Sequence, residues 1–330
     1  MTTPATIPTE AERREAWLAE RRTCLTGTDM AAIFGRGAFG NSGMSVWLDK
    51  KGLNEPKAEN DAMRFGKRWE PFLLQDFSDR TGIEIVPADP YHLFKSTAAP
   101  MGATLDARVV LDMAPVEAKT TSSPGDEWGE QGTDQIPTTY LLQVAAQMHV
   151  TDKPYAHVAA FFRARCETRF YLVQRDLDLE AVMLERAHAW WQRHIVQDIE
   201  PIDGSDAASE YLERRFKRNV TPLLQADEAG AGLMAELAMI RQREERLAMA
   251  RAEAENKLKA IIGEAEGITG AAGKITWKNN KDSEKQDWEG IATMLLNRLP
   301  IAERVNITKS LTIIKPGARV FRFTPTKEKA

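Results

Sequence analysis

Three ionisable residues, Asp106, Glu117 and Lys119, are spaced so that they could act together. Glu117 and Lys119 are two positions apart, and in a strand such residues project from the same face. A hairpin that pairs residues 102–111 with residues 116–119 would bring Asp106 beside them. Two carboxylates next to an ammonium group are costly to assemble unless a hard divalent cation compensates their charge. The pattern therefore predicts that Asp106 and Glu117 hold Mg²⁺, while Lys119 orients an attacking water and stabilises charge on a phosphate.

The elements that must position these residues are two strands and a helix. Apolar and β-branched residues dominate both halves of the hairpin, and residues 112–115 supply the turn. A helix is expected over residues 63–77, because aromatic and leucine residues recur there at helical spacing. Its predicted core face is made by Phe65, Trp69, Phe72/Leu73 and Phe77. Glu70 adjoins that face, and its carboxylate is equally compatible with a metal ligand and with a salt-bridged surface residue.

A second candidate site lies near the N-terminus. A capping box formed by Thr9 and Glu12 begins the first expected helix. A hydroxyl-rich loop, residues 21–29, then leads into a second helix. Arginine and hydroxyl groups at a helix start favour an anion. The alternative is that Thr28 or Asp29 only caps the helix, which is what these residue types usually do.

Composition limits the class of protein. The chain has 330 residues, of which 43% are hydrophobic and 28% charged, with a net charge of −4. It contains no apolar run of membrane-spanning length, and residues 1–9 lack the core of a signal peptide. Its two cysteines, Cys24 and Cys166, are isolated, which predicts neither disulfides nor a zinc site and favours a cytoplasmic protein. Residues 267–330 carry 12 Lys/Arg against 6 Asp/Glu, a basic segment compatible with DNA.

These pieces together resemble the phage lambda exonuclease and YqaJ-like viral recombinase family of PD-(D/E)xK nucleases. A Glu-x-Lys pair alone is weak evidence, but four pieces in the family's order, with compatible spacing, are specific. The matching pieces are Trp17, Arg21 and residues 26–29; residues 65–67 with Glu70; Asp106 with residues 117–119; and Tyr140, Gln143 and Gln147. The resemblance covers about residues 13–197.

The resemblance implies roles for individual residues. Glu70, Asp106 and Glu117 would bind the metal, with the carbonyl of Ala118 as a further ligand. Lys119 would be the catalytic lysine, and Gln143 would help to hold the lysine or the water. Arg21, Thr28 and, with a weaker match, Thr104 would form a 5′-phosphate pocket; Arg22 is a second arginine that could take the place of Arg21. Leu105 departs from the proline that many members of the superfamily have before the aspartate.

The resemblance also implies an α/β fold with a PD-(D/E)xK restriction-endonuclease-like core, a mixed central sheet flanked by helices. The implied activity is that of an alkaline exonuclease: Mg²⁺-dependent, with Mn²⁺ as a substitute, digesting linear double-stranded DNA from 5′ to 3′. The exposed 3′ strand would serve a single-strand annealing protein in phage recombination, in the cytoplasm of a bacterial host. Relatives imply a homotrimer. The alternatives are an endonuclease or repair nuclease of the same superfamily, and an inactive DNA-binding protein.

Two domains are expected, a nuclease core at residues 1–200 and an accessory region at residues 201–330. Apolar residues at alternating spacings of three and four predict a long helix over about residues 224–266. Glu244 and Arg251 interrupt that apolar seam. A basic, β-containing tail at residues 267–330 follows, with strands expected at residues 274–278 and 315–323. The terminal strand could present Arg319 to a phosphate backbone or be a solvated edge.

Overall fold

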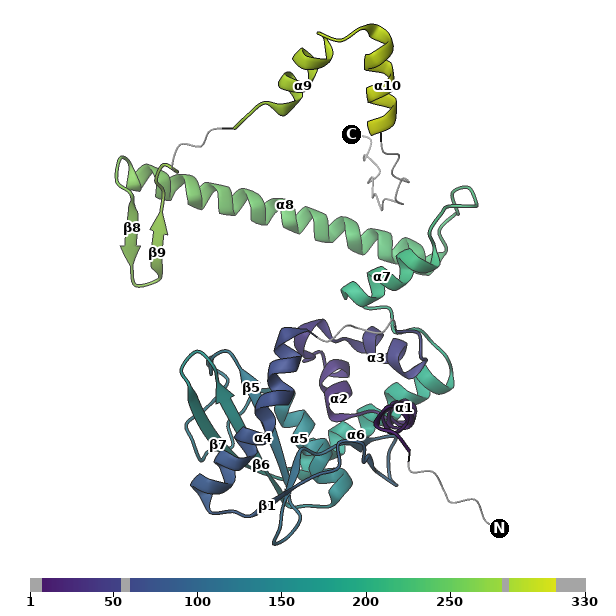
Figure 1. The fold of residues 1–330 in the computed structure, drawn as a ribbon, viewed down its shortest axis with the longest axis vertical. Coiled ribbons are helices and arrows are strands. Elements are labelled where there is room, and N and C mark those ends of the chain that lie inside the picture. Colours follow the sequence, from purple (N-terminus) through teal and green to yellow (C-terminus); the bar gives the residue numbers. More distant parts are fainter. Residues whose placement is uncertain (1–7, 55–59, 281–284, 313–330) are drawn as a thin grey trace. The chain divides into compact units, whose positions relative to one another are not determined.

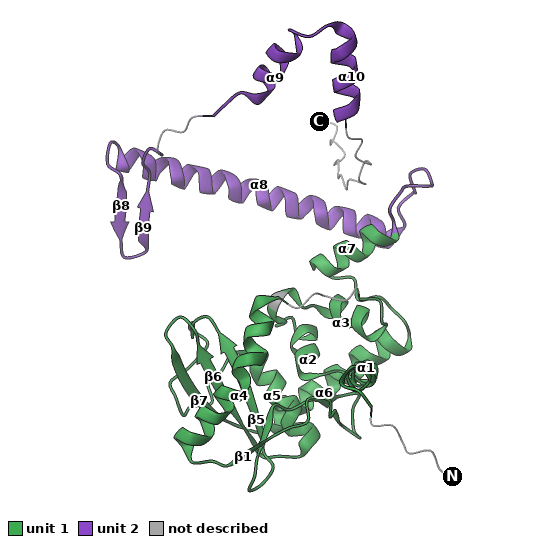
Figure 2. Cartoon of the chain, in the orientation of Figure 1, with its two compact units in different colours: residues 1–215 green, residues 216–330 purple. Residues whose placement is uncertain are grey.

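A computed structural model describes residues 8–54, 60–280 and 285–312 of the chain. The chain forms two compact units, Met1–Arg215 and Phe216–Ala330 (Figure 2). We expected the division at residue 200, but helix α7, Asp206–Arg215, packs into unit 1. Ala208 is buried there, and the Tyr211 ring meets the Trp47 ring edge-on with centroids 5.7 Å apart.

Unit 1 is built on a five-stranded sheet in the order β1-β4-β5-β6-β7 (Figure 1). Strands β5 and β6 are parallel, and every other neighbouring pair is antiparallel. A second, two-stranded sheet joins β2, Phe94–Lys95, to β3, Gly102–Ala103. The strands of the large sheet are β1 (Ile85–Pro87), β4 (Ala107–Val109), β5 (Pro115–Thr121), β6 (Tyr155–Phe162) and β7 (Glu167–Gln174).

Helices flank the sheet, and the expected mixed α/β fold class is confirmed. The side chains of β6 alternate between two apolar cores, as the period of a strand requires. Val158 and Ala160 belong to the larger core, which α2, α3, α5 and α6 share, whereas Ala159 faces the core beneath α4. The helical elements of unit 1 are α1 (Glu10–Arg21), α2 (Gly27–Ile33), η1 (Ala38–Gly40), α3 (Gly43–Lys50), α4 (Asp61–Thr81), α5 (Thr138–Thr151), α6 (Leu177–Trp191), η2 (Gln192–Val196) and α7.

Two sequence expectations for the helices are tested directly. The capping box is confirmed, since the Thr9 hydroxyl accepts the Glu12 N–H and the Glu12 carboxylate accepts the Thr9 N–H. On α4 the buried side chains are Leu73, Leu74 and Phe77, whereas Phe72 is 67% exposed, so Phe72 is not a core residue. The helix continues through Pro71 because the packing of its next turn outweighs one lost hydrogen bond.

Unit 2 contains the long helix α8, Glu228–Ile262, close to the range expected for it. A hairpin of β8, Gly267–Gly270, and β9, Gly273–Thr276, follows. The strand expected at residues 274–278 overlaps β9, and two short helices that were not predicted, α9 (Trp288–Leu296) and α10 (Ile301–Leu311), follow it. The predicted strand at residues 315–323 lies outside the described residues. None of the helices in the described ranges combines the length and apolar character needed to span a membrane.

Candidate active site

The hairpin of β4 and β5 places Asp106, Glu117 and Lys119 together. Strand β5 is central in the sheet, and Glu117 and Lys119 lie on the same face of it, with the Lys119 ammonium bonded to Glu117 Oε1. Asp106 lies just before β4, and its Oδ2 accepts the backbone N–H of Ala118 at 2.8 Å. Because the Asp106 carboxylate bonds to the backbone between them, it is held beside both side chains.

Helix α5 closes the site above Glu117. Gln143 Nε2 donates to Glu117 Oε1 at 2.6 Å, and Gln147 Nε2 donates to Oε2 at 2.5 Å. The Tyr140 ring lies under Lys119, with the ammonium 5.4 Å from the ring centroid. One helix face therefore contacts both the acid and the lysine of β5.

Helix α5 packs closely against α2 because α2 has a glycine, Gly27, at the contact. A Cβ on Gly27 would lie 2.7 Å from Gln143 Cα, so α2 can approach α5 this closely only without a side chain at that position. The close approach brings the start of α2, with Thr28, beside the carboxylates.

Two carboxyl groups of the site, those of Asp106 and Glu70, have raised pKa values. Burial, reinforced by the charge of Glu117, raises the pKa of Asp106 well above its usual value. Burial and Glu117 also raise the pKa of Glu70, which projects from α4. Burial alone would lower the pKa of Lys119, but Glu117 and Asp106 raise it above its usual value, so the side chain stays an ammonium group. Full ionisation of Glu70, Asp106 and Glu117 would therefore give the site more negative charge than Lys119 alone compensates.

The donor set fits a hard divalent cation such as Mg²⁺, which prefers carboxylate oxygens. The Gln147 Oε1 atom is also buried without a hydrogen-bond partner in the described structure. Within the described ranges, however, no three His, Cys, Asp or Glu side chains are grouped as a ready metal site. Both oxygens of Glu117 are directed at Lys119 and the two glutamines, so metal binding requires these side chains to rearrange.

The predicted phosphate-pocket residues also lie near one another. The Arg21 guanidinium stacks on the Trp17 ring, 4.6 Å from its centroid, and Trp17 Nε1 donates to Thr104 Oγ1 at 3.1 Å. Thr104 is two residues before Asp106 in the sequence, so these contacts connect the arginine to the segment that carries the carboxylate. Arg22 is exposed and lies against Gly52 instead.

One cavity of about 1090 Å³ holds both groups. A second cavity of about 350 Å³ shares Thr28, Glu70, Lys119 and Gln143 with it and is also lined by Ala118. Of the predicted site residues, only Arg22 and Ala118 do not line the larger cavity; those that do are Arg21, Thr28, Glu70, Thr104, Asp106, Glu117, Lys119 and Gln143.

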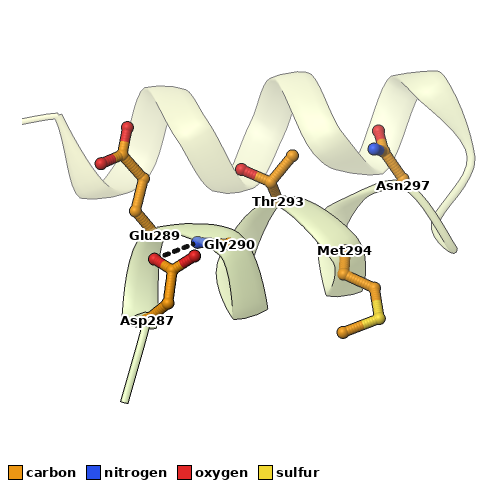
Figure 3. A pocket seen from close by; sticks show the side chains of 6 residues that line it. All are labelled: Asp287, Glu289, Gly290, Thr293, Met294 and Asn297. Atoms are coloured by element: carbon orange, nitrogen blue, oxygen red, sulfur yellow. Dashed lines mark hydrogen bonds between the residues drawn. The ribbon is translucent and has the colours of Figure 1, made fainter. Parts of the chain in front are cut away.

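Unit 2 has a cavity of about 560 Å³ on α9, lined by six residues that Figure 3 shows: Asp287, Glu289, Gly290, Thr293, Met294 and Asn297. The Asp287 carboxylate accepts the Gly290 N–H at 2.9 Å and so serves as the helix cap. Among the described residues that line this cavity there is no lysine, arginine or histidine to pair with its acids, and it does not resemble a catalytic centre.

Sequence reasoning gave no role to three residues of the site. Trp17 and Gln147 are in the family pattern, yet their contacts with Arg21 and Glu117 follow only from the fold. Lys50 had no sequence signal, because a lysine at the end of a short helix usually faces solvent. Its side chain is fully buried here, beside Asp29.

Comparisons with known proteins show what the chain is similar to. Residues 16–154 match the family model described as the YqaJ-like viral recombinase domain. The uncharacterized protein YqaJ of Bacillus subtilis (strain 168) is 26% identical over 288 residues, which are 82% of this chain and 86% of that protein. The uncharacterized protein R354 of Acanthamoeba polyphaga mimivirus is 24% identical over 159 residues, 44% of this chain but 28% of that protein.

Among solved structures, the alkaline exonuclease LHK-Exo of Laribacter hongkongensis aligns with a TM-score of 0.43 at 18% identity. The alignment covers 61% of this chain and 97% of that protein.

Proposed function

We propose that this protein is a Mg²⁺-dependent exonuclease, because residues 16–154 match the model of the YqaJ-like viral recombinase domain. It digests linear double-stranded DNA from the 5′ end and leaves a 3′ single strand. A single-strand annealing protein then uses that strand in recombination. Mn²⁺ substitutes for Mg²⁺.

The observation that carries this proposal is the shared cavity. The Glu117–Lys119 pair on β5 and Asp106 lie in the same cavity of about 1090 Å³ as Arg21. An arginine can bind a terminal phosphate through two parallel N–H···O bonds. A hydrolytic centre and a phosphate-binding arginine in one cavity are what digestion from a phosphorylated end requires.

Each residue of the proposed active site has its own role in the reaction. Glu70, Asp106 and Glu117 would hold the metal with the Ala118 carbonyl; a bound Mg²⁺ would polarise the phosphate and lower the pKa of the attacking water. Lys119, kept as an ammonium group by Glu117 and Asp106, stabilises the charge that develops on the phosphate. Gln143 keeps Glu117 on the β5 face where Lys119 can reach it.

The proposed direction of digestion, from 5′ to 3′, follows from the position of Arg21. Each cleavage exposes a new 5′-phosphate, and Arg21 binds it beyond the cleavage site, which favours forward movement. Trp17 holds the guanidinium plane by stacking, and Thr104 anchors the indole. Arg22 lies outside the cavity and contributes less. By resemblance to relatives, we further propose a homotrimer that encloses the DNA, which light scattering would detect.

The test is digestion of duplex labelled at one end and carrying either 5′-phosphate or 5′-hydroxyl, with Mg²⁺ or with EDTA. We expect release of 5′-labelled nucleotides first, faster from 5′-phosphate ends, and no release in EDTA. Arg21→Ala should slow digestion of the 5′-phosphate duplex about 10- to 100-fold and remove its advantage, because the bidentate bond is lost. Arg22→Ala is the matched control and should change little.

Covalently closed circular duplex separates the alternative. An exonuclease leaves it intact, whereas an endonuclease of the same superfamily cuts it at a rate similar to linear DNA. Earlier loss of 3′ label would contradict the proposed polarity.

A further inference from the structure

We propose that Lys50 is the positioning residue of the 5′-phosphate pocket: its buried ammonium group joins the end of α1 to the start of α2 and so fixes Arg21. The proposal rests on the function proposed above, because it concerns the arginine that binds the terminal phosphate.

Lys50 is unusual for a lysine. It is the last residue of α3, and its side chain is 0% exposed, whereas lysine is almost never fully buried unless it is paired. The ammonium group forms an ion pair with Asp29 Oδ2 at 2.7 Å and donates to the Arg21 carbonyl at 3.1 Å. A buried charge is tolerated only with such partners, so this arrangement is held tightly.

Both partners belong to the pocket. Arg21 is the last residue of α1, so a bond to its carbonyl fixes the backbone from which the guanidinium projects. Asp29 lies on α2, beyond Thr28. One ammonium group thus holds the two sequence segments that supply the predicted phosphate contacts.

The Asp29 carboxylate also fixes the hydroxyl groups of Thr26 and Thr28. The same Oδ2 atom accepts the Thr26 N–H at 2.7 Å and the Thr26 hydroxyl at 2.8 Å. Since the Thr26 proton is used there, the Thr28 hydroxyl, 3.1 Å from Thr26 Oγ1, is the donor of that pair. Burial alone would raise the pKa of Asp29, but Lys50 and the Thr26 N–H lower it, so the carboxylate is ionised.

Lys50 acts through these neighbours and not on DNA. Arg21, Thr28 and Asp29 line the large cavity, and Lys50 does not. Its donors are directed at protein oxygens, including Asp49 Oδ2 at 3.4 Å. Losing the ammonium group should therefore shift the phosphate pocket while leaving Glu117 and Lys119, which are held by α5, in place.

The variant that removes the buried ion pair as a unit is Lys50→Met together with Asp29→Asn, and Asp29→Asn alone, which keeps Lys50 and its bond to the Arg21 carbonyl, separates the part that the lysine plays. Lys50→Met alone leaves a buried carboxylate without its partner, which is strongly destabilising. The double variant removes both charges at similar volume, so the fold is kept while the bond to the Arg21 carbonyl is lost. Lys51→Met is the matched control, because Lys51 pairs with Asp198, 2.6 Å away, outside the pocket.

The experiment measures kcat and KM on duplexes with 5′-phosphate and with 5′-hydroxyl ends, after thermal melting has shown that the full-length variants are folded. For the double variant we expect the preference in kcat/KM for 5′-phosphate to fall about 10- to 100-fold, since a misplacement of about 1 Å can cost about 100-fold. Most of the change should be in KM, and kcat on the 5′-hydroxyl duplex should stay within about twofold of wild type. Lys51→Met should match wild type throughout.

Three outcomes would overturn the proposal, each for a different reason. If wild type prefers 5′-phosphate and the double variant keeps that preference, Lys50 does not position the pocket, while the proposed function stands. If wild type shows no preference, the phosphate pocket itself is wrong, and the role of Lys50 falls with it. Equal loss of kcat on both duplexes would mark a general structural role and would also overturn it.

Discussion

Units 1 and 2 differ in where they keep their apolar side chains. Unit 1 buries two apolar cores, one on each face of its sheet. Within the described residues of unit 2, Ile262 is the one apolar side chain that is buried. Leu233 and Leu247 on α8 are 68% and 70% exposed although they lie on the predicted apolar seam.

The difference bears on what each unit can do by itself. A catalytic constellation needs side chains locked by packing on several sides, and β5, α4 and α5 supply this in unit 1. The described part of unit 2 has helices with good sequence signals but no core that would order their side chains. We therefore expect the proposed chemistry in unit 1, and any contribution of unit 2 through its charge or through its surfaces.

The largest expected effect is on DNA cleavage, which variants of unit 1 should lose and a variant of unit 2 should keep. Lys119→Ala should lower Mg²⁺-dependent cleavage about 100- to 1000-fold while DNA binding remains, because the ammonium group acts on developing charge. Asp106→Ala should lose both activity and metal binding. Lys257→Ala on α8, an exposed lysine of unit 2 paired with Glu253, is the control and should cut at the wild-type rate. Nearly normal cleavage by either unit 1 variant would contradict the assigned site.

The second contrast between the units is how much a leucine side chain in each contributes to the stability of the protein. Leu142→Ala, at a side chain 2% exposed in the larger core, should cost about 2–5 kcal/mol of unfolding free energy. Leu247→Ala makes the same chemical change at an exposed position and should cost less than about 0.5 kcal/mol. Chemical denaturation of the two full-length variants measures both values. A similar cost for both would show that the α8 seam is covered by a partner.

The third comparison concerns charge, which is distributed unevenly along unit 2. Residues 216–266 contain eight Lys/Arg and nine Asp/Glu, whereas residues 267–330 carry 12 Lys/Arg and 6 Asp/Glu. If Arg319, Arg322 and nearby lysines bind phosphates, truncation after Glu266 should lower the salt slope of DNA binding by about one for each phosphate that is no longer bound. Truncation after Arg215 should lower it by the same amount, and both proteins should still fold and cut. An unchanged slope would leave the tail as a packing or partner-binding element.

How far sequence predicts this molecule depends on the range of the contacts involved. Glu117 and Lys119 follow from strand alternation, and Asp106 from the hairpin, because these relations are local. On α4 the helical spacing of apolar residues allows either Phe72 or Leu73 on the core face. Only tertiary packing selects Leu73 for the core.

Local patterns fail at longer range. Lys50 meets Arg21 and Asp29 across 29 and 21 positions of sequence, and nothing in its own neighbourhood marks it as buried. The boundary at Arg215, 15 positions beyond the expected residue 200, depends in the same way on Tyr211 meeting Trp47. Packing between distant segments is not encoded in any one local pattern.

The smallest expected effect is a pH dependence within unit 1. Hydrogen bonds from Arg175, at 2.6 and 2.9 Å, and from His149 lower the pKa of Glu180 below its usual value. A carboxyl group whose pKa is lower in the folded state stabilises the fold above its unfolded pKa of about 4.3. That stabilisation is lost as the pH falls through the lower, folded value.

Glu180→Gln keeps the shape but removes this ionisation, so its stability should fall less than that of wild type between about pH 5 and pH 3. The exposed Glu185, on the same helix, gives the control Glu185→Gln with an equal change in charge. Denaturation midpoints across this pH range test the effect. Parallel curves for wild type and Glu180→Gln would show that the ionised Glu180 carboxylate, with its Arg175 contacts, does not stabilise unit 1.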